Sequence, residues 1–498
     1  MSAAVRILLA TAYALAVAAP ALAQCPDGSP PPCARPASRA AAPVNSVAVL
    51  YFDNLSRDTA DVFLADGLTD ELITRLGQVR RLDVRSRFES QRVRGQRSAD
   101  PRALGRTLRA EYLVSGSIQQ AGQRVRVNVA LVRASNGAQA WGSIYDRTGQ
   151  DILQIQSDIA SEVAGAITGQ LLPQERATLA RRPTRDPVAY DLYLRGVGAA
   201  NTFSEAGLRA GLDYFDRALA RDSAFADAWV QYGIAWMVLS DGYIEGRVGY
   251  ARAREAATRA LRLDSTNVLA YGTLAATAVA LDADGAAARR WAQRAQRLDP
   301  REWVSHCVLS WVWLMSDNGA DSAITEARQA WESDTLSAVP AWNYLMVLAA
   351  LRRTDDLAAA LPRVQSALAP EDLRAFDGVV RLERGDPAGA AERLRWSYYG
   401  GVLAAEYVRA QLALGRPEAA RAAVDSMVAL SRTAYYNAFS VARAYAALGQ
   451  ADDAFSWLDR AWDQRTNWVA FVRAYAEFAP LHADPRWAAF LRRTGATR

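Results

Sequence analysis

The chain has 498 residues, of which 51% are apolar and 22% are charged, and its formal net charge is +5. A chain of this length is too long for one hydrophobic core, which indicates two to four domains. The small net charge comes without a basic block, so we expect no nucleic-acid partner.

The sequence lacks several residue types and motifs that catalytic sites commonly use. All 58 cationic residues are arginine, which excludes phosphate-loop, kinase-type and Schiff-base lysines. The only two histidines, His306 and His482, cannot form a three-histidine zinc site or an HExxH protease motif. We therefore expect a protein without catalytic residues, metal or cofactor.

Residues 1–23 have the pattern of an export signal. Arg6 precedes the apolar run ILLATAYALAVAAPALA, which ends in the small-residue pattern of a cleavage site at Ala23. The run is shorter than the ~20 residues of a membrane span, so we expect no integral span after cleavage and a location in the periplasm or cell envelope. Cys25 raises a lipoprotein as the alternative, which Gln24 before it disfavours.

Residues 24–45 are rich in proline and alanine and predict an extended linker. Cys25 and Cys33 enclose the stretch CPDGSPPPC, and in an oxidising compartment this pair is a candidate disulfide. The alternative is a proline-rich tether whose cysteines have no role. Cys307 lies beside His306, but adjacent helix residues do not face each other, so we expect a packed cysteine.

Residues 46–172 predict a small α/β domain with a mixed sheet. The short apolar run VAVLYF predicts a buried strand, and LDVRSR predicts a second strand after a helix over about 61–78. Asp100-Pro101 begins a helix through Arg109. Three strands with alternating apolar residues follow, separated by turns such as Asn136-Gly137, and predict an antiparallel meander with one solvated face. A helix over about 152–171 completes the domain.

Six segments of this region together resemble a known domain. They are VAVLYFDNLS, FLADGLTDELITRL, YLVSGSI, RVRVNVALV, AWGSIYDR and DILQIQSDIA, and their order and spacing resemble the TolB amino-terminal-like (FlgO-like) domain that bacteria place before tetratricopeptide repeats. The resemblance implies a non-catalytic α/β module. Relatives often carry a DNA-binding, cyclase or kinase domain upstream, where this chain has an export signal.

Three carboxylates in LADGLTDELITRL, Asp66, Asp70 and Glu71, form the main candidate for a catalytic site. On a helix the leucines of this stretch make one stripe, and Asp66 and Asp70 fall on the opposite face. Glu71 precedes Arg75 by four residues, the spacing of a helix ion pair. We therefore predict that the leucines build the core and that Asp66 and Asp70 face solvent.

Ten arginines between Arg80 and Arg109 form a second candidate site. They could attract an anionic ligand such as a glycan, a phospholipid headgroup or an acidic protein. The alternative is an arginine-biased solvated surface, because arginine fills every cationic role in a chain without lysine.

After a linker over residues 173–187, residues 188–498 predict an all-α superhelix of tetratricopeptide repeats with a C-terminal cap. At a step of 34 residues, small and aromatic residues recur at the positions where paired helices approach. About eight units are expected, and they begin near Tyr190, Trp229, Tyr271, Cys307, Trp342, Gly378, Ala404 and Ala442.

Such arrays bind through a concave face lined by the first helix of each unit. The register places Asp227, Asn343, Arg409, Tyr436 and Arg443 there, where they could hold a peptide by its amides or carboxylates.

The sequence thus predicts an α+β multidomain protein: a small α/β domain with a mixed sheet followed by an all-α superhelix. Its expected function is a non-catalytic scaffold that binds a protein or peptide in the repeat groove. The α/β domain would be a second interaction surface, with self-association as one use of it. Two alternatives remain, an envelope enzyme or glycan-binding protein that uses an acidic site, and a signalling sensor, which rests on family association alone.

Overall fold

The computed structural model describes residues 43–495 apart from 59–60, 97–99, 123, 149–151, 181, 203, 301, 317, 336–337, 366, 396–402 and 434. Residues Pro43–Arg498 form one compact unit. The predicted signal peptide, linker and Cys25–Cys33 pair lie outside the described residues. None of the helices in the described ranges has the length and apolar character needed to span a bilayer.

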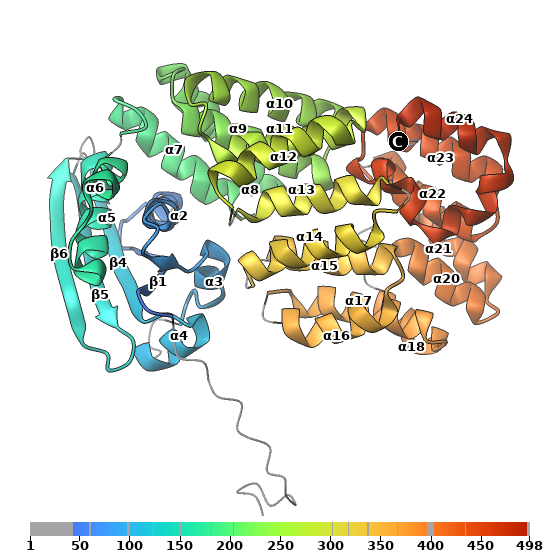
Figure 1. Cartoon of the computed structure of the whole chain (residues 1–498), viewed down its shortest axis with the longest axis horizontal. Helices are drawn as coiled ribbons and strands as arrows, with labels where there is room; N and C mark the ends of the chain where they lie inside the picture. Colours follow the sequence, from blue (N-terminus) through green and yellow to red (C-terminus); the bar gives the residue numbers. More distant parts are fainter. Residues whose placement is uncertain are drawn as a thin grey trace, which may run out of the picture. The chain divides into compact units, whose positions relative to one another are not determined.

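The first part of this unit is a mixed sheet with helices (Figure 1). The strand order is β3-β1-β4-β5-β6, and β2 also pairs with β4. β1 is parallel to β3 and β4, whereas β4, β5 and β6 form the antiparallel meander that the sequence predicted. The strands are β1 (Ser46–Val49), β2 (Asp53–Asn54), β3 (Asp83–Val84), β4 (Tyr112–Ala121), β5 (Arg124–Arg133) and β6 (Gln139–Thr148).

Helices cover the two faces of the sheet unequally. One face packs against α2 (Asp61–Gly77) and α5 (Ile152–Thr168), where the valines and leucine at alternate positions of β5 are buried. On the other face, α3 (Arg87–Arg92) and α4 (Pro101–Leu108) cover only the region around Ala48, Leu113 and Ala134. The remaining face of β4, β5 and β6 is therefore open to solvent.

The rest of the unit consists of antiparallel helix pairs. Eight pairs follow one another within the described residues, in agreement with the predicted all-α array. They are α7 (Pro187–Ala200) with α8 (Glu205–Arg221), α9 (Ala226–Gly242) with α10 (Gly246–Leu263), α11 (Val268–Asp282) with α12 (Gly285–Leu298), α13 (Trp303–Leu314) with α14 (Ala320–Ser333), α15 (Ala338–Ala350) with α16 (Thr354–Val364), α17 (Pro370–Glu383) with α18 (Pro387–Leu394), α20 (Ala404–Ala413) with α21 (Pro417–Thr433), and α22 (Ala438–Ala447) with α23 (Ala451–Gln464).

The repeat signal in the sequence corresponds to this packing. The helices α20 and α22 begin 34 residues apart, at Ala404 and Ala438. Small residues lie where paired helices touch: on α12, Ala288, Ala292 and Ala295 are fully buried. Since a small side chain lets two helix axes approach, the alanine spacing sets the close packing of each pair.

Two departures from the predicted organisation concern the ends of the array. The predicted linker over 173–187 contains a short helix, α6 (Pro173–Leu179). After α23 the chain continues as two 3₁₀ helices, η2 (Asn467–Ala474) and η3 (Ala476–Ala483), before α24 (Pro485–Thr494). The boundary between the α/β domain and the array stays a prediction, because both belong to the same compact unit.

Candidate functional site

The three carboxylates of LADGLTDELITRL are buried. The exposed fractions of Asp66, Asp70 and Glu71 are 6%, 5% and 8%, so the prediction that Asp66 and Asp70 face solvent is wrong. The leucines of α2 do pack on the sheet, as expected. The opposite face of α2 is covered as well, because α7 from the helical array packs against it.

Glycine makes this helix crossing possible. A Cβ atom on Gly67 of α2 would lie 1.9 Å from the carbonyl oxygen of Leu194 on α7. On α7, a Cβ atom on Gly198 would lie 2.3 Å from the carbonyl oxygen of Phe63. The two helices therefore approach to backbone contact, and neither position accepts a side chain without a shift of the helices.

The buried acids of α2 bind residues of α7. The hydroxyl of Tyr193 donates a hydrogen bond to Glu71 at 3.1 Å, and Arg195 donates to Asp61 at 2.9 Å. The side-chain amide of Asn201 donates to Asp70. These carboxylates thus fasten the α/β part of the molecule to the first helix of the array.

The other partners of these acids come from the α/β part itself. Arg94 forms a bidentate pair with Asp66, at 2.7 and 2.8 Å, and its guanidinium lies over the ring of Tyr51. The hydroxyl of Tyr51 donates to Asp70 at 2.7 Å. Burial raises the pKa of Asp66 to about 6 against the lowering effect of Arg94, and burial also raises the pKa of Asp70.

A raised carboxyl pKa is one sign of a catalytic acid, but Asp66, Asp70 and Glu71 are buried among protein groups. None of the three lines either of the two cavities described below. Their oxygens accept hydrogen bonds from protein groups, which fits a structural role.

Several arginines of the 80–109 stretch are engaged within the protein. Arg81 forms a bidentate pair with Glu175, and Arg85 pairs with Asp83. Together with Arg94, these residues hold carboxylates of the chain itself. An anionic ligand at the remaining arginines of the stretch stays a prediction.

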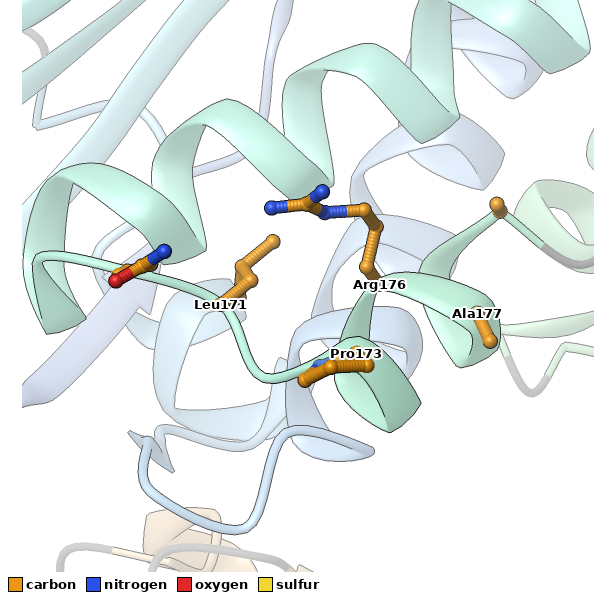
Figure 2. A pocket seen from close by; sticks show the side chains of 6 residues that line it. Leu171, Pro173, Arg176 and Ala177 are labelled. Atoms are coloured by element: carbon orange, nitrogen blue, oxygen red, sulfur yellow. The ribbon is translucent and has the colours of Figure 1, made fainter.

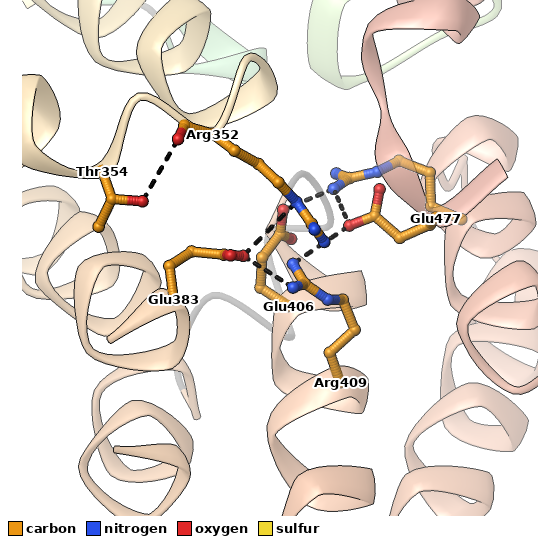
Figure 3. Close-up of polar contacts among 7 residues, drawn as sticks. Arg352, Thr354, Glu383, Glu406, Arg409 and Glu477 are labelled. Carbon is orange, nitrogen blue, oxygen red and sulfur yellow. Dashed lines mark hydrogen bonds and ion pairs between the residues drawn. The ribbon is translucent and has the colours of Figure 1, made fainter. Parts of the chain in front are cut away.

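Two of the five predicted groove residues join a buried ion network (Figure 3). Arg409 on α20 donates to Glu383 at 2.7 Å, and Arg443 on α22 donates to Glu406 at 2.5 Å. Both arginines also contact Glu477 of η3, at 3.5 and 3.2 Å. The first helices of the array therefore hold a carboxylate, and this carboxylate belongs to the C-terminal part of the same chain.

The charges of this network balance by mutual pairing. Burial by itself raises the pKa of Glu477, but Arg443 and Arg409 outweigh it and lower that pKa. Burial raises the pKa of Glu406 even though Arg443 is beside it. Since an unpaired charge at this depth costs about 3–5 kcal/mol, Glu477 is a structural counter-ion for Arg443.

The other three predicted groove residues lie in different environments. The side-chain oxygen of Asn343 on α15 accepts a hydrogen bond from the indole of Trp311 at 2.7 Å, and its amide donates to Ser310. Tyr436 is buried just before α22, and Asp227 is partly exposed in the first turn of α9. A role in binding a partner stays a prediction for all five residues.

Residues 467–483, which form η2 and η3, lie against the first helices of the array; we call them the C-terminal segment. Aromatic contacts join it to α13, α15 and α22: Trp311 with Phe471, Trp342 with Trp468, and Phe439 with Tyr475, at ring distances of 6.3, 5.9 and 5.3 Å. One side of the segment is deeply buried, with Val472 and Phe478 fully inaccessible to solvent, whereas residues such as Ala476 and Pro480 are exposed.

Among the described residues, the C-terminal segment therefore covers the inner face at α13, α15 and α22. All positions of α13 and α22 are buried or partly buried, whereas second helices such as α23 keep an exposed side. Near the segment, Asn467 donates to Asp241 at the end of α9, and Gly246 at the start of α10 lies against the carbonyl of Arg465. The segment thus connects late and early pairs of the array.

Two cavities open on the surface of the α/β part. One, of about 450 Å³, lies where α5 leads into α6 and is lined by Leu171, Pro173, Arg176 and Ala177 among others (Figure 2). The other, of about 720 Å³, is lined by both acids and arginines, including Asp61 and Arg195. Neither concentrates the groups of one charge or of one reaction type.

In the described ranges, no group of three or more His, Cys, Asp or Glu residues could hold a metal ion. Cys307 is buried on α13, as predicted for a packed cysteine, and burial raises its pKa. His306 instead pairs with Glu326 through Nδ1 at 2.7 Å.

The sequence analysis did not identify residues whose contacts are distant in the sequence. Glu477 gave no signal because its partners precede it by 34 and 68 residues. Gly67 and Gly198 were visible as glycines within helical patterns, and such glycines indicate a close backbone approach when a packing reason exists.

No family model matches the chain. The chain is 32% identical over 189 residues to a putative adenylate cyclase 3 of Rhizobium meliloti strain 1021. The match covers 38% of this chain and spans about a third, 32%, of that relative's length.

The similar solved structures include tetratricopeptide repeat proteins. One, from Thermus thermophilus, is 18% identical and covers 38% of this chain and 98% of its own, with a TM-score of 0.31. A second, from Parabacteroides merdae, is 11% identical and covers 51% and 93%, with a TM-score of 0.34. The human IFIT1 dimer with PPP-AAAA is 12% identical and covers 63% and 85%, also with a TM-score of 0.34. Similarity at this level supports no conclusion about function.

The helix crossing gives a direct prediction. Gly67→Ala places a Cβ atom against the Leu194 carbonyl and should lower the free energy of unfolding by about 1–3 kcal/mol, the usual range for overpacking. Gly77→Ala is the matched control on the same helix, since its Cβ would meet nothing within 4 Å and alanine favours a helix by up to ~1 kcal/mol. Urea unfolding measures both; equal stability of the two variants would contradict the crossing.

The pKa of Asp66 predicts a pH dependence. Because this pKa is about 6 in the fold and 3.8 ordinarily, the fold binds a proton at Asp66 more tightly than the unfolded chain. The stabilisation that comes from this bound proton is complete below about pH 4 and is lost as the pH rises through about 6. The stability of the wild type relative to Asp66→Asn should fall over this window, by about 1.4 kcal/mol per unit of pKa difference.

The measurement is urea unfolding of both proteins over the pH series, with Asp213→Asn as the control because Asp213 is exposed. A difference between wild type and Asp66→Asn that stays constant with pH would contradict a raised pKa.

Proposed function

We propose that the protein is an exported, non-catalytic scaffold that binds other polypeptides. The observation that carries this proposal is the array of eight helix pairs, fastened to the α/β part through Gly67 and the buried acids of α2. An array of this kind provides an extended, rigid surface for protein contacts. The acids that were the main catalytic candidates are used in that attachment, which argues against the envelope-enzyme alternative.

The proposal includes two finer points that rest on the sequence. Residues 1–23 act as an export signal and place the mature chain in the periplasm or cell envelope. The α/β part is a TolB amino-terminal-like domain that serves as a second interaction surface. The described antiparallel meander and the flanking α2 and α5 are consistent with that resemblance.

The packing of residues 467–483 on the inner face bears on where a partner could bind. A peptide could reach Asn343, Arg409 and Arg443 on the inner face only after residues 467–483 had left it. Fully burying one large apolar side chain stabilises a protein by about 1.5–3 kcal/mol, and the segment buries several, including Phe471, Val472 and Phe478. We therefore place the partner on the outer surface of the array.

A signalling role is the second candidate, and the partial match to a putative adenylate cyclase favours it. In this role the chain would bind a partner that carries the output activity. The two candidates share the protein-binding step, and the identity of the captured partner distinguishes them.

Photo-cross-linking in cells tests the proposal. Amine-reactive cross-linkers have no lysine side chain to modify in this chain, so a photoreactive phenylalanine analogue is introduced in place of an aromatic residue. Trp291 on α12, the second helix of its pair, is 39% exposed and tests the outer surface, whereas the buried Tyr436 tests the inner face. Mass spectrometry identifies the captured protein and its compartment.

We expect one reproducible envelope protein to be captured from position 291 and none from position 436, and purified components to reconstitute the complex. Capture from position 436 would establish binding at the inner face. Failure to capture any protein from outer positions, including Trp291, would overturn the scaffold function.

A further inference from the structure

The strand β6 is an unprotected edge of the sheet. It is ten residues long and, in the part of the chain that the structure describes, its backbone pairs only with β5. It lies at the margin of the sheet in Figure 1. Edge strands are usually blunted by proline, by charged side chains or by a covering element. The strand β6 contains no proline and is mostly exposed, and its two charged residues, Asp146 and Arg147, form ion pairs with arginines of β5 and with Asp158 of α5. Its outer edge offers backbone groups to another strand.

The open face of β6 has one conspicuous apolar residue. Ile144 is 69% exposed, the largest exposure of any large apolar side chain within a described helix or strand. Its neighbours on this face are small or polar: it pairs with Asn128 on β5, and Gly142 is two residues away. A second strand could therefore lie beside Ile144 without steric conflict from side chains of β6.

The helix-covered face of β6 has charges arranged along the edge. Arg147 pairs with Asp158 of α5 at 3.3 Å. The indole of Trp141 donates to Glu162, one turn further along α5, at 3.1 Å. Glu162 is exposed, and no cation among the described residues forms an ion pair with it. Each edge thus has the Arg147–Asp158 pair at one end and Glu162, an acid without an ion pair among the described residues, at the other.

We infer that a second copy of this chain binds here, with the two β6 strands antiparallel and a two-fold axis at Ile144. In this register the two Ile144 side chains meet on the open face. Trp141 and Arg147 are each three residues from Ile144, so Trp141 of each copy lies opposite Arg147 of the other. The second copy's Arg147 then approaches both the Trp141 ring and the Glu162 carboxylate.

Charge complementarity selects this occupant and this register. The antiparallel edge brings an arginine to an acid and an indole at both ends, which suits an ion pair and a cation–π contact. An axis at Tyr145 would place Ile144 opposite Asp146, and an axis at Asp146 would place two carboxylates opposite each other. A two-fold axis also makes the contact closed, as in most homodimers.

This inference deepens the proposed function, because it assigns self-association to the second interaction surface. It is nevertheless tested on purified protein without any partner. Failure of dimerisation therefore leaves the cross-linking result unaffected, and failure of partner capture leaves dimerisation unaffected.

Sedimentation velocity of the full chain over a concentration series is the test. We expect the wild type to dimerise and Ile144→Lys to weaken the dimer at least tenfold, because it places two ammonium groups opposite each other. Val248→Lys is the matched control: Val248 is 49% exposed on α10, and its substitution should leave the dimer unchanged. Circular dichroism confirms that all variants are folded.

A charge exchange identifies the register. Arg147→Glu and Glu162→Arg should each weaken the dimer, and the double variant should restore it, since each copy then offers the reversed pair. A wild type that stays monomeric, a dimer that resists Ile144→Lys, or a double variant no better than the single ones would overturn the inference. A monomer whose Ile144→Lys variant loses a different protein partner would assign the edge to that partner instead.

Discussion

The covering of the array's inner face depends on the contact between Glu477 and the two arginines Arg409 and Arg443. This contact joins the C-terminal segment to the first helices that would otherwise line a binding groove. Removing Glu477 from the site would leave Arg443 buried with less compensation, at a cost of several kcal/mol. The aromatic contacts of Trp468, Phe471 and Phe478 act in the same direction. The inner face is consequently part of the hydrophobic core, which is why the proposed partner contacts are assigned to the outer surface and the sheet edge.

A second constraint is the backbone contact between α2 and α7. The helix α2 packs on the sheet with its leucines and on α7 with Gly67 and its acids, so one helix belongs to the cores of both parts. Motions of the α/β part relative to the first repeat would break the hydrogen bonds of Asp70 and Glu71. The proposed scaffold would therefore present its surfaces in a fixed arrangement, which favours simultaneous contacts over alternating ones.

The sequence predicted features that depend on local periodicity. The alternating valines of β5 gave the meander, and the 34-residue step gave the helix pairs, because the residues concerned are neighbours in sequence. The solvent-facing position of Asp66 and Asp70 was wrong because their cover, α7, follows more than 110 residues later. Periodicity predicts which side of a helix is apolar. It does not predict whether the polar side is also buried and hydrogen-bonded. The same limit applied to Arg443, whose partner Glu477 follows it by 34 residues and lies outside its helix pair.

The central claim is that residues 467–483 are a permanent part of the array. Hydrogen–deuterium exchange of the full chain, followed by mass spectrometry, tests it most directly, since exchange reports local opening. If the claim holds, peptides from 467–483 and from α13, α15 and α22 will exchange slowly and with the same denaturant dependence as α11. Fast exchange of 467–483, together with exposure of the peptides that contain Asn343 and Arg443, would contradict it and show an inner face that opens to a ligand.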